Sequence, residues 1–103
     1  MIFIETETFT EDINSLLDDD EYAALQQFLA DQPDAGERIE GTGGLRKIRW
    51  AMSGHGKRGG IRVIYFHRTA ASEIRFLLAY RKGIKDDLTA REKAVLRAIN
   101  RDW

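Results

Sequence analysis

The amino-acid sequence predicts an α+β fold in which a twisted antiparallel sheet packs against two N-terminal helices and one C-terminal helix. Apolar residues recur at helical spacing before residue 33 and after residue 89, and three short β-type runs follow one another between residues 45 and 81. The connections between these runs are short, which favours an antiparallel meander because parallel neighbours need a crossover of a dozen residues or more. The length of 103 residues predicts one domain, 1–103, around one core.

The first element is expected to be a short edge or opening strand, because residues 2–4 form an apolar run. Thr8 or Thr10 can then cap a helix that continues through Leu17. The apolar positions of this segment recur at helical spacing.

Two capping boxes predict the starts of the other helices. Asp18 with Glu21 favours a start near residue 18, and Thr89 with Glu92 favours a start near residue 89. Pro33 is expected to end the earlier of these helices, since proline cannot continue one.

The middle of the chain predicts three strands, Leu45–Trp50, Ile61–His67 and Glu73–Arg81. A glycine-rich loop over Ala51–Gly60 and a turn over Thr69–Ser72 are expected to join them. The period of two predicts two sets of residues that each share a face: Arg62, Ile64 and Phe66, and Arg75, Leu77, Ala79 and Arg81.

The charges are segregated along the chain although the formal net charge is only −1. Residues 1–40 carry twelve acids and one base, residues 41–72 carry seven bases and no acid, and residues 73–103 carry eight bases and five acids. A segment with seven cations and no counter-charge predicts a positive patch that prefers a polyanion. The absence of cysteine excludes disulfides and is compatible with the cytoplasm, and no apolar run approaches the ~20 residues that cross a bilayer.

The run GHGKRGG, residues 54–60, does not fit the familiar glycine motifs. It matches GxGxxG literally, but a strand rather than a helix is expected to follow it. A P-loop fails because Ala51 stands where the first glycine belongs. His55 and His67 have no recognised ligand spacing, so structural or surface roles are expected for both and no metal site is predicted.

A glycine-rich loop that presents Lys57, Arg58 and Arg62 to phosphate remains as the functional interpretation of this run. A solvated hairpin loop whose basic residues serve only solubility is the open alternative.

Three sequence runs carry a resemblance that favours the functional interpretation. GTGGLRKIR at 41–49, GKRGGIRVIY at 56–65, and YRK at 80–82 followed by KDDLT at 85–89 resemble the HigB-like branch of the RelE/ParE toxin superfamily. The resemblance implies a RelE-like fold and a bacterial or phage-borne toxin of a type II toxin–antitoxin system. It further implies an mRNA interferase, a ribosome-dependent endoribonuclease that cleaves mRNA in the ribosomal A site.

The resemblance also implies that a cluster of cations catalyses attack of the RNA 2′-hydroxyl on the adjacent phosphorus without a metal or other cofactor. The matching positions are Lys57, Arg58, Arg62, Arg81 and Lys82. Arg62 is expected to stabilise the transition-state charge, Lys57 to act as general base, and Arg81 or Lys82 to assist the leaving oxygen. The general acid is left open, because only Trp103 follows the last helix, where some relatives place a tyrosine or histidine.

The expected RNA-binding residues are Arg46, Lys47, Arg49, Tyr65 and Lys85. For Tyr65, alternation with Arg62 favours packing in the sheet over stacking on a base. The cations of the last helix, Arg91, Lys93, Arg97 and Arg101, are expected to form a solvated face.

The partners implied by the resemblance are a cognate antitoxin with a helix-turn-helix, mRNA and ribosomal RNA, with no membrane. Two other functions stay open at this point. A ParE-like member would bind DNA gyrase and cut nothing, and an inactive relic would keep only the nucleic-acid-binding fold.

Overall fold

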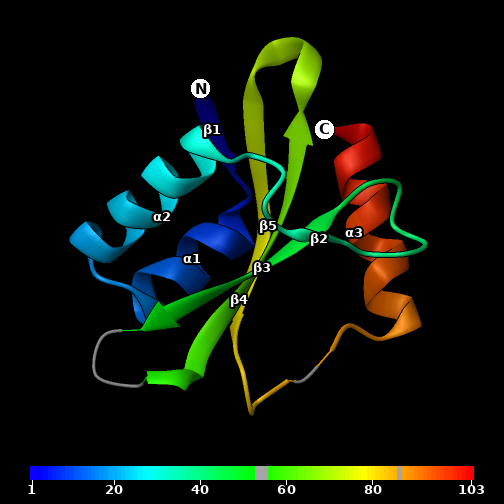
Figure 1. Cartoon of the computed structure of the whole chain (residues 1–103). Helices are drawn as coiled ribbons and strands as arrows, with labels where there is room; N and C mark the ends of the chain where they lie inside the picture. Colours follow the sequence, from blue (N-terminus) through cyan, green and yellow to red (C-terminus); the bar gives the residue numbers. More distant parts are fainter. Residues whose placement is uncertain (53–55, 86) are drawn as a thin grey trace.

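The computed structural model describes residues 1–52, 56–85 and 87–103, and for residues 52 and 56–59 it describes the backbone alone. A five-stranded sheet of order β1-β5-β4-β3-β2 separates α1 and α2 from α3 (Figure 1). The elements are β1 (Ile2–Glu5), α1 (Glu7–Leu16), α2 (Asp19–Asp31), β2 (Glu37–Arg38), β3 (Arg46–Met52), β4 (Gly56–Arg68), a 3₁₀ turn (Thr69–Ala71), β5 (Glu73–Arg81) and α3 (Ala90–Asp102).

The expected α+β fold and the antiparallel meander of β3, β4 and β5 are confirmed. The sheet as a whole is mixed, because β1 pairs in parallel with β5, from Ile2 opposite Glu73 to Glu5 opposite Phe76. The long connection between these two strands makes a parallel pair available. The two-residue strand β2, which pairs with β3, is too short to show a period in the sequence.

Both capping boxes are confirmed. Asp18 Oδ1 accepts from the Glu21 backbone N–H at 2.8 Å, and Thr89 Oγ1 accepts from that of Glu92 at 3.1 Å. The expected caps of α1 were wrong, because Thr6 rather than Thr8 or Thr10 occupies that position.

The structure shows why Thr6 caps α1. Its Oγ1 accepts from the Phe9 backbone N–H at 3.0 Å and donates to the carbonyl of Leu77 at 2.9 Å. The second bond depends on β5, which lies 71 residues away in the chain, so local sequence alone could not favour this threonine.

Each face of the sheet carries its own apolar core. Under α1 and α2, the rings of Phe9 and Phe76 stack with centroids 4.6 Å apart, and neither residue is exposed. Under α3, buried leucines and Ile64 form a second core: Leu45, Leu77, Leu88 and Leu96.

An irregularity in the β4–β5 ladder changes which residues of β5 share a face. Ile64 pairs with Leu78 while Tyr65 pairs with Phe76, so Leu77 is the extra residue of a bulge. The expectation that residues 75, 77, 79 and 81 share a face was therefore wrong. Leu77 joins the core under α3 and Ala79 the core under α1 and α2.

The loop expected over Ala51–Gly60 is shorter than predicted, because β3 continues to Met52 and β4 begins at Gly56. Residues 53–55, including His55, lie outside the described residues. Gly60 is required by close packing of the two strands, since a Cβ atom there would meet the carbonyl oxygen of Trp50 at 2.6 Å. In the described part of the chain, no helix has both the length and the apolar composition needed to span a membrane.

Candidate functional site

Three neighbouring strands place a row of polar side chains on the α3 face of the sheet. Arg49 of β3 lies opposite Arg62 of β4, and Arg62 lies opposite Tyr80 of β5. Lys47 precedes Arg49 by two residues and so shares its face. The bulge at Leu77 is what brings Tyr80 to this side of the sheet.

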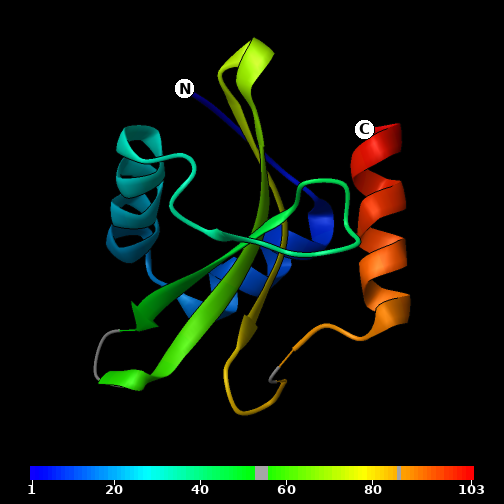
Figure 2. The same cartoon turned by 45° about the vertical axis from the view of Figure 1, so that its right-hand side comes forward.

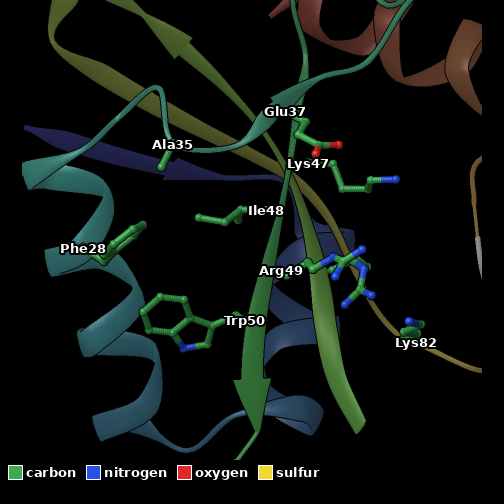
Figure 3. Close-up of a pocket in the computed structure, with 9 residues that line it drawn as sticks. Phe28, Ala35, Glu37, Lys47, Ile48, Arg49, Trp50 and Lys82 are labelled. Carbon is green, nitrogen blue, oxygen red and sulfur yellow. The ribbon is translucent and has the colours of Figure 1, made fainter. Parts of the chain in front are cut away.

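A groove of about 510 Å³ runs along this row and around β3. Its cations are Lys47, Arg49, Arg62 and Lys82, and we call it the basic groove. Figure 3 shows Lys47, Arg49 and Lys82 on one side of β3, while Phe28, Ala35, Ile48 and Trp50 lie on the other. The groove therefore combines an apolar wall with a polar wall that holds the four cations and the carboxylate of Glu37.

Arg62 is the least exposed cation of the basic groove, with only 5% of its surface accessible. Its Nη1 donates to the carbonyl of Ile61 at 3.3 Å, and no carboxylate of the described residues lies within 4.0 Å of its guanidinium. Removing a charge from water without a partner is costly. These surroundings of Arg62 are typical of a guanidinium that binds an anionic ligand.

Asp87 and Tyr80 lie beside this cluster. Asp87 accepts from the Leu88 backbone N–H at 2.9 Å and lies 3.5 Å from Lys47 Nζ, and these two interactions lower its pKa. Burial and the charge of Asp87 raise the pKa of Tyr80, against an opposing effect of Arg62. The phenol therefore keeps its proton at neutral pH, and its buried oxygen has no hydrogen-bond partner among the described residues.

Sequence reasoning missed Tyr80 as a neighbour of Arg62 and Asp87 as a neighbour of Lys47. No pattern in the sequence marks the bulge that turns Tyr80 toward the row. For Asp87 a signal existed, because it is an acid embedded in the run KDDLT directly before the capping box of α3.

The residues predicted to be catalytic do not all gather in one place. Arg62 and Lys82 line the basic groove, and the Lys82 backbone N–H donates to the Gly60 carbonyl at 3.1 Å. Arg81 pairs with Ile61, a residue of the core under α1 and α2, so alternation directs it away from the row. Lys57 and Arg58 fall within the first residues of β4, but their side chains lie outside the described part of the structure.

Two of the predicted RNA-binding residues form hydrogen bonds with the protein's own backbone. Arg46 Nη1 donates to the Gly36 carbonyl at 2.8 Å, and its Nε lies 3.6 Å from Asp34 Oδ1. Tyr65 is 0% exposed, and its hydroxyl donates to the Pro33 carbonyl at 2.8 Å. The ring has no exposed surface on which a base could stack, which favours packing in the sheet over the predicted contact with RNA.

The other predicted RNA-binding residues lie in or beside the basic groove. Lys47 and Arg49 line it. Lys85 forms an ion pair with Glu92, and its Nζ lies 5.9 Å from the centroid of the Tyr80 ring.

His67 has a structural position. Its Nδ1 lies 2.8 Å from Asp34 Oδ1, and this hydrogen bond is the main reason why the pKa of Asp34 is lowered. Within residues 1–52, 56–85 and 87–103, no three histidine, aspartate or glutamate side chains gather as metal ligands would.

Comparison with protein families agrees with this architecture. The model of the family described as "RelE toxin of RelE / RelB toxin-antitoxin system" matches residues 8–103, which is nearly the whole chain. The chain therefore belongs to the RelE toxin family and is a toxin of a toxin–antitoxin system with a cognate antitoxin as its partner.

Proposed function

We propose that this toxin is a ribosome-dependent mRNA endoribonuclease of the HigB-like branch. The observation that carries the proposal is Arg62, a buried guanidinium without a described counter-charge, among three other cations of the basic groove. Toxins of the RelE family are generally endoribonucleases. The runs GTGGLRKIR and GKRGGIRVIY support the finer placement in the HigB-like branch.

The proposed reaction uses the nucleophile that RNA itself contains. The 2′-hydroxyl loses its proton to a base and forms a bond to the adjacent phosphorus, while the bond from phosphorus to the 5′-oxygen of the next nucleotide breaks and that oxygen gains a proton. The products are a 2′,3′-cyclic phosphate and a 5′-hydroxyl. Alignment, proton transfer and positive charge are sufficient for this chemistry, and side chains can supply all three.

Arg62 is proposed to bind two non-bridging phosphate oxygens and to stabilise the charge that develops on them. Its planar guanidinium suits this bidentate role, and its burial strengthens the interaction. Arg49, opposite Arg62 on β3, and Lys47 are proposed to hold the RNA backbone.

Proton transfer is proposed for other cations of the cluster. Lys57 is the proposed general base, with Arg58 adding positive charge beside it, and Lys82 assists the leaving 5′-oxygen from the end of β5. Arg81 remains a second candidate for that step, and Lys85 for a contact with the RNA backbone.

Induction of the wild type and of Arg62→Ala in a bacterial host, with the 5′ ends of cellular mRNA mapped alongside growth, tests this function. Wild type is expected to arrest growth with cuts inside translated regions, and Arg62→Ala to do neither while remaining folded. Arg68→Ala is the matched control, because Arg68 lies at the opposite end of β4, half exposed, and pairs with Glu73 at 3.7 Å.

Two results would contradict the proposal. Growth arrest with intact mRNA would favour a ParE-like inhibitor of gyrase. Harmless expression of the wild type would favour an inactive relic.

A further inference from the structure

The last helix carries a second row of cations on the side that meets the loop between β2 and β3. Lys93, Arg97 and Arg101 follow one another at four-residue spacing. They line a groove of about 530 Å³ together with Gly41 and three alanines. Figures 1 and 2 both show the loop between β2 and β3 beside α3. We call this feature the α3 groove.

The loop that borders the α3 groove is rich in glycine, and three of its glycines have positive φ angles. Gly41, Gly43 and Gly44 have φ angles of 78°, 74° and 106°, which favour glycine. Thr42 is buried, and its hydroxyl donates to the Ile39 carbonyl at 2.6 Å. A Cβ atom on Gly41 would meet nothing within 4 Å, so the space beside it is open to a ligand.

Among the residues that the structure describes, no acidic side chain lines the α3 groove. Arg97 has no carboxylate partner within 4.0 Å among the described residues, and a Cβ atom at Gly43 would lie 3.6 Å from its Nε. Arg101 Nε lies 3.4 Å from Asp102 Oδ1, but both side chains are 72% exposed, and such pairs contribute little. The groove therefore keeps most of its positive charge for a ligand.

We propose that the α3 groove binds the sugar-phosphate backbone of structured RNA, at a site separate from the basic groove, a proposal that rests on the proposed function. Four helical residues rise about 6 Å, so the three cations form a regular row along one strand of phosphates. The alanines Ala90, Ala94 and Ala98 keep the floor low, so that a backbone can approach the cations closely.

A nucleic acid fits this side of α3 better than a protein does. Protein interfaces are centred on large apolar and aromatic side chains, whereas the apolar side chains that line the α3 groove in the described part of the chain are those of three alanines. The exposed apolar residues of α3, Val95 and Ile99, belong to other positions of the helix, and Val95 lines a separate apolar pocket with Leu78 and Leu96.

The two grooves are electrostatically connected. Lys93 contributes to lowering the pKa of Asp87, whose larger causes are the Leu88 backbone N–H and Lys47 of the basic groove. The carboxylate of Asp87 therefore interacts electrostatically with one cation of each groove.

The affinity of the purified full chain for an RNA duplex of about 16 base pairs, measured by fluorescence anisotropy over a series of salt concentrations, tests this proposal. Arg97→Glu is expected to weaken binding several-fold and to make the slope of log K against log salt shallower by about 1. Arg91→Glu is the matched control with the same charge change on the same helix, because Arg91 lines the apolar pocket instead. It is expected to keep the wild-type slope.

Equal losses in Arg97→Glu and Arg91→Glu would overturn the proposal, because they would show a response to net charge alone. The double variant Lys93→Gln, Arg97→Gln removes the contacts without adding repulsion and is expected to weaken binding as well. Unchanged duplex affinity together with lost antitoxin binding would assign the groove to the antitoxin and would also overturn the proposal.

This test can fail independently of the proposed function. The duplex contains no exposed single strand to be cleaved, so its binding does not depend on catalysis. If the toxin cleaves mRNA in cells but Arg97→Glu does not change duplex binding, only the proposed RNA site in the α3 groove is overturned. If mRNA stays intact in cells, the proposed nuclease function is overturned.

Discussion

At the scale of single residues, two buried arginines on the same face of the sheet differ in what surrounds them. Arg75, 8% exposed, has its Nε 3.2 Å from Glu73 Oε2 and donates from Nη1 to the Asn100 carbonyl at 3.1 Å. Arg62, 5% exposed, has a single backbone carbonyl as its described hydrogen-bond partner. The first arginine joins β5 to α3, whereas the second has no described side-chain partner, which is consistent with its proposed role in binding phosphate.

This contrast predicts opposite effects of the same substitution. Arg62→Met is expected to leave the free energy of unfolding unchanged or to raise it, because it removes a buried charge without a described counter-charge. Arg75→Met is expected to lower that free energy by about 1–3 kcal/mol, because it leaves the buried Glu73 with the half-exposed Arg68, 3.7 Å away, as its remaining described cation. Urea denaturation of both variants checks this pair of outcomes. A large loss of stability in Arg62→Met would contradict the assignment of Arg62 to ligand binding.

Two buried tyrosines on opposite faces of the sheet give a second matched pair. The Tyr65 hydroxyl donates to the Pro33 carbonyl and accepts from the Gly36 backbone N–H, whereas the Tyr80 hydroxyl has no partner among the described residues. Tyr65→Phe is expected to cost about 1–3 kcal/mol of unfolding free energy, and Tyr80→Phe to cost nothing or to stabilise. Thermal unfolding of both variants measures the difference, and equal losses would mean that the Tyr80 hydroxyl has a partner in solution.

The sequence indicated that cations cluster in this protein, but it could not indicate which of them is buried. Arg62 and Arg75 occupy similar places in their strands, each at a polar end of an apolar run. Their surroundings come from β3, β5 and α3, which are distant in the chain, so the distinction is a property of tertiary packing.

At the scale of secondary-structure elements, features specified within a few residues were predictable. The capping boxes of α2 and α3 and the exact bounds of β5 follow from local patterns. The features that failed depend on distant partners. The cap of α1 uses a carbonyl of β5, and the bulge of β5 becomes visible only in its register with β4.

Helix α1 also contains a carboxyl group whose position is unfavourable at neutral pH. Burial raises the pKa of Asp12 above its ordinary value of 3.8, in spite of a hydrogen bond with the Ala79 backbone, and Asp12 Oδ2 is buried without a partner among the described residues. The ionised form is therefore less favourable in the folded chain than in the unfolded chain.

Asp12→Asn is expected to stabilise the protein at pH 7, because the amide keeps an acceptor for Ala79 and carries no charge. The pKa of Asp12 is higher in the folded chain than in the unfolded chain. The wild type therefore loses stability as the pH rises from 3.8 through the folded pKa, and this loss is absent below pH 3.8. The advantage of the variant should therefore shrink as the pH falls to that value. Chemical denaturation at several pH values checks this.

Asp20→Asn is the control for this experiment. Asp20 is an exposed acid in the first turn of α2, where the helix dipole favours negative charge, so its removal should change stability little or lower it. An equal gain in both variants would indicate a response to net charge rather than to the burial of Asp12.

At the scale of the whole molecule, the sheet separates two sides of opposite charge. Helices α1 and α2, on one side, contain no lysine or arginine, whereas α3, on the other, contains four (Figure 1). The segregation of charge along the sequence thus becomes a segregation in space. Such a molecule is oriented by a polyanion before contact, with its basic side forward.

The sequence predicted this polarity because its charges are segregated by segment and its helices are placed by local signals. It could not predict that the basic side holds two grooves. The α3 groove exists because the loop 41–44 lies beside α3, which is a tertiary contact.

The most direct test of the central claim is the chemistry of the RNA ends produced in a reconstituted translation reaction. Purified ribosomes with a defined codon in the A site would be incubated with wild type, Arg62→Met or the control Arg68→Ala. Wild type and Arg68→Ala are expected to cut in that codon and leave a 2′,3′-cyclic phosphate and a 5′-hydroxyl, and Arg62→Met to leave the mRNA intact. Intact mRNA with the wild type, or a 5′-phosphate at the cut, would contradict the account.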